Sequence, residues 1–254
     1  MGNVTRTLAI YALRGLMLTL ITLATAQAGD IDDFMRGMQR RMGIKPNEWR
    51  AIEIFITDHY AVINPAFTPL SADTSFRYMW NGPDLKINGK AATDEEQRQV
   101  RAEMFQKVQF DKLPQRTFGN GQNKVILFTA FDCPHCQKLE ERLNRIGEKL
   151  NATVYVVPGT LSSKSQERKD AVRDFWCAPN PMESWVAWMT KRVAPPRAKS
   201  SCRYADTLGD AIHAMGITMT MSVTTPTLLA EDGSRIDTSA EDSILRALGS
   251  KRGN

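Results

Sequence analysis

The feature that most constrains this chain is an apolar, β-prone run that ends in two closely spaced cysteines. Residues 125–131 read Val-Ile-Leu-Phe-Thr-Ala-Phe, and a Cys-Pro-His-Cys sequence at Cys133–Cys136 follows after one aspartate. Apolar residues then repeat at helical spacing between residues 139 and 150. The pattern predicts a buried strand followed by a helix, with both cysteines at the junction.

The two cysteines are not equivalent at such a junction. Cys133 lies where unpaired N–H groups and the positive end of the helix dipole favour an anion, whereas Cys136 lies one turn further in. Pro134 suits the first helical turn, and a protonated His135 adds positive charge beside the sulfur. We therefore expect Cys133 to be the reactive thiolate of a redox pair.

Three other readings of the cysteine pair are weaker. A structural zinc site needs four clustered ligands, but Cys177 and Cys202 stand singly, and His59 and His213 belong to no ligand motif. Covalent haem attachment is excluded because Gln137, not histidine, follows the second cysteine. A static disulfide remains an alternative, although a bridge that closes so short a loop removes little entropy from the unfolded chain.

The N-terminus has the pattern of a secretory signal peptide. Arg6 and Arg14 precede or flank a short apolar run at 16–24, and Ala26-Gln-Ala28 follows, so residues 1–28 are the expected signal peptide. An uncleaved N-terminal anchor is the alternative. Both readings place the rest of the chain outside the cytoplasm, where disulfides persist.

Charge argues against nucleic acid as a partner. Removal of the signal peptide lowers the formal net charge from +5 to +3, because two arginines and no acidic residue precede Asp30. The basic residues are scattered among acidic ones, without an aromatic-interleaved basic stripe. About 226 residues remain, enough for one catalytic domain and a smaller one.

Residues 29–111 are expected to form a separate, smaller α+β domain. Apolar spacing predicts helices over 32–42, which Gly43 would end, and over 47–60. Alternation and turn residues predict strands at 76–80 and 85–90. Trp49 and Trp80 are core candidates, with a partner or substrate surface as the less common reading.

A linker helix and a polar segment are expected to join this domain to the next. Thr93 and Glu96 form a capping-box pattern that opens a helix. The polar, glycine-containing segment 111–123 then resembles a linker, which places the domain boundary near residue 112. Residues 112–254 would form the redox domain.

The redox domain reads as strand, helix, strand, helices, strand, strand, helix. The helix over 133–150 leads to a β-branched run at 153–157, which predicts a parallel strand pair with a right-handed crossover. A mostly helical insert is expected at about 161–217, with helices near 167–176, 183–192 and 204–215.

Cys177 and Cys202 lie 25 positions apart within this insert. An even cysteine count in an oxidising compartment favours pairing, and a loop of that length would contribute roughly 3 to 4 kcal/mol in the chain-entropy model. We interpret the pair as a structural disulfide. A second redox pair is the alternative, although neither cysteine has a Cys-X-X-Cys partner.

The last part of the chain enters a strand through a proline. Pro226 follows Thr225 and precedes the run 227–230, and a cis bond there would leave the preceding backbone free to pair with a bound peptide. Asp232-Gly233 then signals a hairpin, and Thr238 with Glu241 is expected to cap a final helix. The whole order predicts an α/β sandwich.

Together these features resemble the thioredoxin-fold domain of periplasmic disulfide isomerases of the DsbC and DsbG type. The resemblance covers about residues 112–250 and rests on three motifs: Phe131-Asp-Cys-Pro-His-Cys136, the Cys177/Cys202 pair in a helical insert, and Thr224-Thr-Pro-Thr227. It implies a cis Pro226 against the active-site cysteines, preceded by Thr225, and a structural second cysteine pair. It also implies a V-shaped homodimer joined by an N-terminal domain.

Two departures from that family are evident. The Pro134-His135 dipeptide is associated with strongly oxidising DsbA proteins, and it suggests an acidic thiol and an oxidising couple. Residues 80–90 and the helix from Thr93 only loosely resemble the end of the family's dimerisation domain, and residues 29–75 match none of its motifs.

The expected function is that of a periplasmic thiol:disulfide interchange enzyme, most simply an isomerase, that needs no metal or organic cofactor. Cys133 would attack and Cys136 resolve, His135 would stabilise the thiolate, and Thr225 and Pro226 would hold client backbone. Its partners would be unfolded or misoxidised secreted proteins, a thiol-disulfide redox partner and a second copy of the chain. The alternatives are a DsbA-like dithiol oxidase, a chaperone-like binding module, and a dedicated assembly factor.

Overall fold

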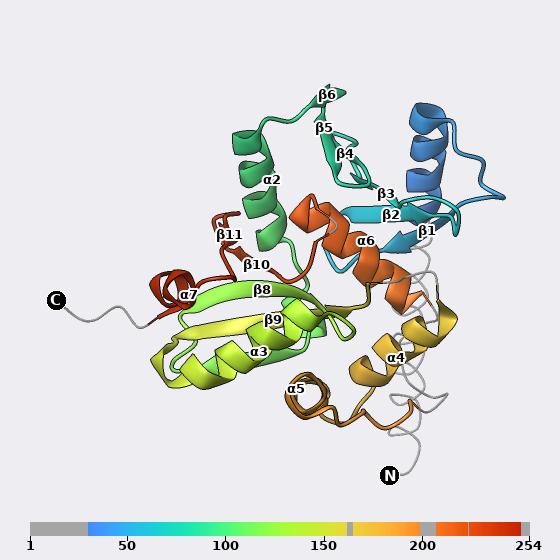
Figure 1. The fold of residues 1–254 in the computed structure, drawn as a ribbon. Helices are drawn as coiled ribbons and strands as arrows, with labels where there is room; N and C mark the ends of the chain where they lie inside the picture. The colour runs from blue at the N-terminus through green and yellow to red at the C-terminus, as the bar shows by residue number, and fades with distance from the viewer. Residues whose placement is uncertain (1–29, 162–164, 199–206, 223, 250–254) are drawn as a thin grey trace, which may run out of the picture. The chain divides into compact units, whose positions relative to one another are not determined.

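The computed structural model describes residues 30–161, 165–198, 207–222 and 224–249 (Figure 1). The expected signal peptide therefore lies outside the described residues. By internal contacts, the chain up to Ala51 forms one compact unit and Ile52–Asn254 form another. In the first unit, residues 30–42 are helical and Gly43 follows with a φ of 65°, a value that glycine adopts without strain, so the helix expected there is confirmed.

Six short strands form a sheet in which sequence neighbours are also spatial neighbours. From β2 to β6, each strand is antiparallel to the next. The strands are β1 Arg50–Glu53, β2 His59–Ile63, β3 Leu70–Asp73, β4 Tyr78–Asn81, β5 Asp84–Ile87 and β6 Lys90–Ala91. The two strands expected from the sequence correspond to β4 and β5. Trp80 in β4 is only 1% exposed, in agreement with the core reading of this residue.

The helix expected over residues 47–60 is wrong, because this segment forms β1 and β2. Ile52, Ile54 and Ile56 are buried at alternate positions, which is the spacing of a strand. Phe55 has a φ of 58°, which lies outside the helical region. The apolar residues at 52, 55 and 56 imitate one face of a helix only when the buried Ile54 is left out.

Helix α2 (Asp94–Gln106) begins with the capping box that the sequence predicts. The Glu96 amide donates to the Thr93 hydroxyl oxygen at 3.3 Å, and the Thr93 amide donates to the Glu96 carboxylate at 2.8 Å. Beyond α2, segment 111–123 is more than a linker, because it contains strand β7 (Gln115–Phe118) paired with β9. The proposed domain boundary near residue 112 stays a prediction.

A second sheet has the strand order β11-β10-β8-β9-β7. Strands β8 (Asn123–Ala130) and β9 (Ala152–Gly159) are parallel, as expected, and helix α3 (Pro134–Ile146) connects them. Strand β10 (Thr227–Ala230) is antiparallel to both β8 and β11 (Arg235–Ile236), which confirms the hairpin. A parallel strand-helix-strand unit beside an antiparallel hairpin is the thioredoxin-like fold.

Helices cover both faces of this sheet, and each face has its own apolar core (Figure 1). One core joins the sheet to α3 and α7, and the other joins it to α2 and α6. The expected helical insert is present in its described parts. Its third helix was expected near 204–215 and ends later, at Thr220. The helices after α3 are α4 Gln166–Trp176, α5 Pro181–Lys191, α6 Leu208–Thr220 and α7 Glu241–Leu248.

The predicted cap of the last helix is wrong, because α7 begins after Ala240 without a side-chain cap. The Asp237 carboxylate instead accepts the amide of Ser239 at 2.8 Å and its hydroxyl at 2.7 Å. This local turn occupies the residues around Thr238, so the helix begins later.

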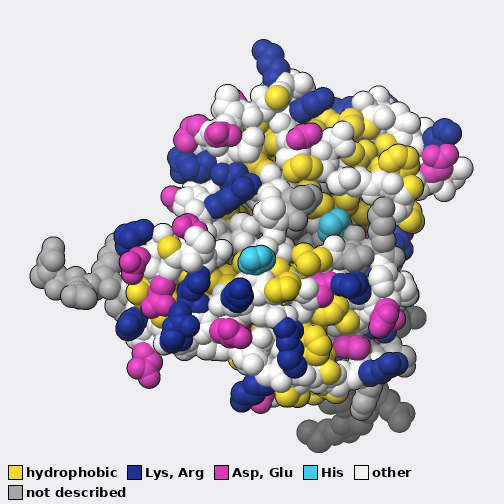
Figure 2. Space-filling model, viewed as in Figure 1, with side chains coloured by type: hydrophobic (Ala, Val, Ile, Leu, Met, Phe, Trp, Pro, Cys, Tyr) yellow, Lys and Arg dark blue, Asp and Glu magenta, His cyan; other side chains and the backbone are white. Residues whose placement is uncertain are grey.

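Charge on the molecule is mixed in sign. On the face shown in Figure 2, Lys and Arg side chains lie interspersed with Asp and Glu. None of the helices in the described ranges combines the length and the apolar character that a membrane crossing requires. Within those same ranges, no cluster of three or more His, Cys, Asp or Glu residues is arranged to hold a metal ion.

Candidate redox active site

Strand β8 leads directly to Cys133 at the start of α3. Cys133 is the N-cap of the helix, with extended backbone angles, and Pro134 occupies the first helical turn. The backbone amide of Cys136 donates to Cys133 Sγ at 3.3 Å, so the sulfur occupies a place that a capping oxygen often takes. The backbone therefore places Cys133 at the helix start, Pro134 in the first turn and Cys136 further into the helix, as the sequence predicts.

Both cysteines of the pair are free thiols and are largely buried, with 3% of Cys133 and 2% of Cys136 exposed. Pro134 and His135, which lie between them, are exposed. The two buried sulfurs are thus separated along the chain by an exposed turn. The expected role of His135 beside a Cys133 thiolate stays a prediction.

The loop before β10 brings a second segment to Cys133. The Thr225–Pro226 peptide bond is cis. Cys133 Sγ donates to the backbone oxygen of Thr225 at 3.7 Å, although the two residues are 92 positions apart. Antiparallel pairing of β10 with β8, in which Thr227 lies opposite Phe128, places this loop beside the last residues of β8. The structure thus brings the Thr225 backbone to Cys133, while the client-binding roles of Thr225 and Pro226 stay predictions.

The environment of Cys136 favours its protonated form. Burial raises the pKa of the Cys136 thiol, and the interaction with Cys133 raises it further. The hydroxyls of Thr129 and Thr225 and the Ala130 backbone act in the opposite direction, but burial is the largest effect. Cys136 is consequently a neutral thiol at neutral pH.

Asp132, directly before Cys133, was missed as a site residue. Its carboxylate accepts the Thr160 hydroxyl at 3.0 Å and the Leu161 amide at 2.9 Å, and it forms an ion pair with Arg168. These contacts join the redox loop to the segment after β9 and to α4. An acidic residue next to the first cysteine was the available signal, but its partners lie 28 or more positions away.

Cys177, at the end of α4, is disulfide-bonded. Cys202 lies outside the described residues, so the predicted Cys177–Cys202 pairing stays a prediction. His59 is buried and His213 is half-buried, and desolvation lowers the pKa of each, so both are neutral at neutral pH.

The curated relatives of the chain are named as thiol:disulfide interchange proteins. No family model matches the chain. A probable thiol:disulfide interchange protein DsbC of Bordetella pertussis is 26% identical over 168 residues, which are 66% of this chain and 56% of the relative. The corresponding protein of Bordetella parapertussis is 29% identical over 135 residues, 51% of this chain and 45% of the relative. The chain thus spans about half the length of the curated relatives it matches.

Solved structures with a related arrangement include a disulfide interchange protein of Neisseria gonorrhoeae. It is 26% identical, with a TM-score of 0.38 over 47% of this chain and 80% of that chain. The DsbA of Chlamydia trachomatis is 16% identical, with a TM-score of 0.36 over 54% of this chain and 88% of that chain. By sequence, the chain is similar to probable thiol:disulfide interchange proteins of the DsbC type, and its Cys133–Cys136 pair lies at the start of α3 in a thioredoxin-like fold.

Proposed function

We propose that this protein is a thiol:disulfide interchange enzyme that isomerises disulfides in secreted proteins. The observation that carries the proposal is the position of Cys133 Sγ, which meets the Cys136 amide on one side and the Thr225 carbonyl on the other. An amide and a helix N-terminus favour sulfur as an anion, and the neighbouring loop offers backbone to a client. Sequence similarity to DsbC-type interchange proteins supports the same chemistry.

The exchange begins with attack by the Cys133 thiolate on one sulfur of a client disulfide. A bond forms between Cys133 and that sulfur, and the client's other sulfur leaves as a thiolate, which can take a proton from water. This thiolate can attack a second disulfide in the client. A client thiolate finally attacks the mixed disulfide and releases Cys133, so the client is rearranged without net oxidation or reduction.

Cys136 supplies a second exit from the mixed disulfide. Its thiolate attacks Cys133 Sγ, the client leaves as a thiolate that is then protonated, and the protein retains a Cys133–Cys136 disulfide. The client is thereby reduced, and a dithiol partner must reduce the protein again. Because burial raises the pKa of Cys136, this exit is slow at neutral pH and gives the client time to rearrange. This delay favours isomerisation.

Thr225 and Pro226 would align the client for attack. The Thr225 carbonyl, which accepts a hydrogen bond from Cys133 Sγ, lies next to the attacking sulfur, and the backbone of this cis-proline loop would pair with an extended client peptide. Cys133 itself is almost fully buried. A client that pairs with this backbone would present its disulfide where the sulfur can reach it.

A dithiol oxidase is the second candidate, because Pro134 and His135 separate the cysteines. A positively charged histidine at this place would stabilise the thiolate and therefore the reduced form, which makes the couple more oxidising. An oxidase would act only in its disulfide form and only on reduced clients.

The proposal also includes a cellular location and an oligomeric state. Residues 1–28 would direct the chain to the periplasm, and residues 29–111 would join two copies into a homodimer that holds misoxidised clients. Sedimentation velocity of the mature chain at several concentrations tests the dimer. A monomer at all concentrations would favour the oxidase.

Trapping of the mixed disulfide tests the chemistry directly. The Cys136→Ala variant, incubated with a scrambled disulfide-containing protein, should accumulate a covalent adduct through Cys133, visible by intact mass and removed by reductant. The Cys133→Ala variant serves as the control and should form no adduct. Full exchange activity in Cys133→Ala would refute the assignment.

A further inference from the structure

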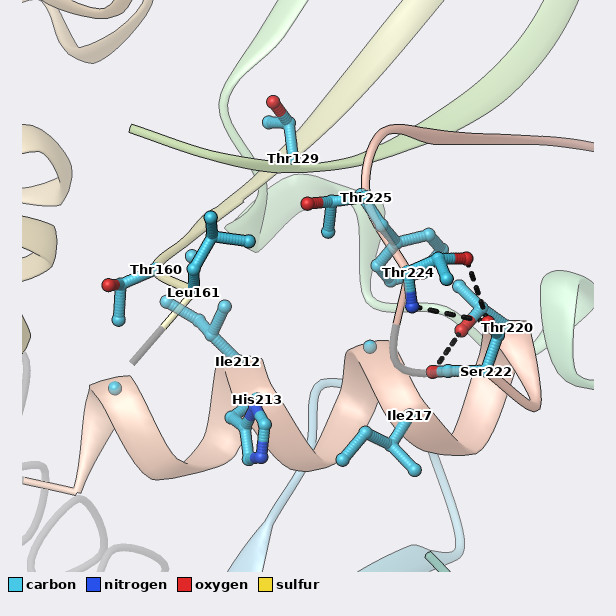
Figure 3. A pocket seen from close by; sticks show the side chains of 14 residues that line it. Thr129, Thr160, Leu161, Ile212, His213, Ile217, Thr220, Ser222, Thr224 and Thr225 are labelled. Carbon is cyan, nitrogen blue, oxygen red and sulfur yellow. Dashed lines mark hydrogen bonds between the residues drawn. The ribbon is translucent and has the colours of Figure 1, made fainter. Parts of the chain in front are cut away.

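A cavity of about 160 Å³ opens beside the redox centre, on the α6 face of the second sheet (Figure 3). One wall is the loop that holds Thr225, whose backbone oxygen lies 3.7 Å from Cys133 Sγ. Another wall contains Thr160 and Leu161, which Asp132 binds through its carboxylate. Both walls are thus joined to residues of the redox loop, so the cavity has a fixed place relative to Cys133.

The remaining wall is the face of α6 toward the sheet. Ile212, Ile217 and Gly216 line the cavity from this helix, opposite Phe128 of β8. Glycine at 216 leaves room there, because a Cβ built on it would lie 3.7 Å from a Phe128 ring carbon, an ordinary contact distance. At the rim, Leu161 is 58% exposed.

Most hydroxyl groups around the cavity are already paired with other groups. The Thr220 hydroxyl donates to the Ser222 carbonyl at 2.9 Å, and the Ser222 and Thr224 hydroxyls are 2.8 Å apart (Figure 3). The Thr160 hydroxyl donates to Asp132. The lining therefore offers chiefly methyl and methylene groups to an occupant, despite its many threonines.

The Thr225 hydroxyl is also not offered to an occupant. Thr225 Oγ1 is inaccessible to solvent, and it acts on the Cys136 thiol, whose pKa it lowers. Thr225 therefore adds no polar group to the accessible surface of the cavity through its side chain.

The lining carries no carboxylate, ammonium or guanidinium group among the described residues that form it. His213 also lines the cavity, and its burial lowers its pKa, so the imidazole is neutral at neutral pH. A charged occupant would lose its hydration without gaining a counter-ion. The volume matches that of engineered cavities of about 150 Å³ that hold one benzene ring.

We propose that this cavity is a specificity pocket that takes one uncharged, apolar side chain of the client, within two positions of its reacting cysteine. The client backbone would pair with Thr225 while this side chain enters between Phe128 and α6. The proposal rests on the proposed interchange function and adds a substrate class to it: disulfides flanked by residues such as leucine or valine.

A series of short peptides tests the pocket. Each peptide has one cysteine, activated as its mixed disulfide with nitrothiobenzoate, and carries leucine, glycine, glutamate or lysine at the positions within two residues of that cysteine. Attack by reduced Cys133 forms a Cys133–peptide disulfide and releases the coloured nitrothiobenzoate thiolate. We expect leucine at the pocket position to react about tenfold faster than glutamate or lysine, because only the charged side chains lose hydration uncompensated.

Gly216→Leu should fill the pocket, with Gly216→Ala as the matched control that gains a similar helix propensity but little volume. The preference for leucine over glutamate and lysine should fall to about twofold or less in Gly216→Leu and persist in Gly216→Ala. Circular dichroism checks the fold of both. If Gly216→Leu does not fold, the peptide series on the unaltered protein still decides the question.

The symmetric nitrothiobenzoate disulfide contains no peptide, so it tests the interchange function separately from the specificity pocket. Reaction with this small disulfide, combined with equal rates for all peptides, would overturn the pocket and leave the interchange function intact. Failure to react with the small disulfide and with every peptide would overturn the interchange function and the pocket with it.

Discussion

At the scale of single residues, the redox centre depends on different environments for two identical side chains. Both cysteines are almost fully buried, but Cys133 caps α3 and contacts the Thr225 carbonyl, whereas Cys136 lies within the first turn of the helix. The proposed nucleophile and the proposed resolving thiol are therefore distinguished by their positions on the helix. The sequence predicted this difference because a Cys-X-X-Cys pair after a strand has only one member at the helix N-terminus.

The raised pKa of Cys136 predicts how the mixed disulfide responds to pH. Burial disfavours the thiolate, so the reactive form of Cys136 is scarce at neutral pH and increases about tenfold with each pH unit below the raised pKa. The lifetime of a preformed mixed disulfide should shorten by about that factor from pH 7 to pH 8, as measured by acid quench and mass spectrometry. The Cys136→Ala variant lacks this exit, and a wild-type lifetime unaffected by pH would contradict the assignment.

The ion pair between Asp132 and Arg168 is expected to affect the reactivity of Cys133. Arg168 pairs with the Asp132 carboxylate one residue before Cys133, so Arg168→Ala leaves this carboxylate less compensated. The rate of alkylation of Cys133 at pH 7 should fall about two- to threefold, a modest effect because Arg168 is partly exposed. Asp132→Asn should raise the rate, and Arg168→Lys should restore most of the wild-type value. Identical rates for wild type and Arg168→Ala would exclude an electrostatic role for this ion pair.

At the scale of elements, strand β7 shows what the sequence did not reveal. Strand β7 pairs with β9 but begins with three polar residues, Gln115, Arg116 and Thr117. Because these residues show no alternation of apolar and polar side chains, the segment resembled a linker. The polar character has a structural cause, because Arg116 forms an ion pair with Glu140 of α3 at 2.6 Å. This pair joins the edge of the sheet to the helix that begins at Cys133.

The Arg116–Glu140 pair predicts a measurable stability. Glu140 has a side-chain exposure of only 3%, so Arg116→Met leaves a buried carboxylate unpaired and should lower the free energy of unfolding by about 3 kcal/mol at pH 7 in urea titrations. Glu140→Gln in the same background should recover most of the loss. Burial raises the pKa of Glu140, so protonation relieves the unpaired charge and the deficit should shrink from pH 7 to pH 5. A loss that is the same at both pH values would argue against this cause.

At the scale of the whole molecule, local patterns predicted the second sheet better than the first. The long apolar runs of β8 and β9 and the periodic apolar residues of α3 predicted a strand, a helix and a second strand. This order of elements predicted a parallel strand pair, which the structure confirms. The segment 47–60 was misread because the apolar residues at 52, 55 and 56 have helical spacing, although the buried residues Ile52, Ile54 and Ile56 alternate as in a strand. Contacts across long separations, such as Asp132 with Arg168, have no local signature.

The most direct test of the central claim is reactivation of a disulfide-scrambled enzyme by the purified mature chain, with reduced and oxidised forms compared and Cys133→Ala as the control. We predict that the reduced form restores activity by reshuffling wrong disulfides and that Cys133→Ala does not. Reactivation by Cys133→Ala at the wild-type rate, or no reactivation by either form of the wild-type chain, would contradict isomerisation at this site.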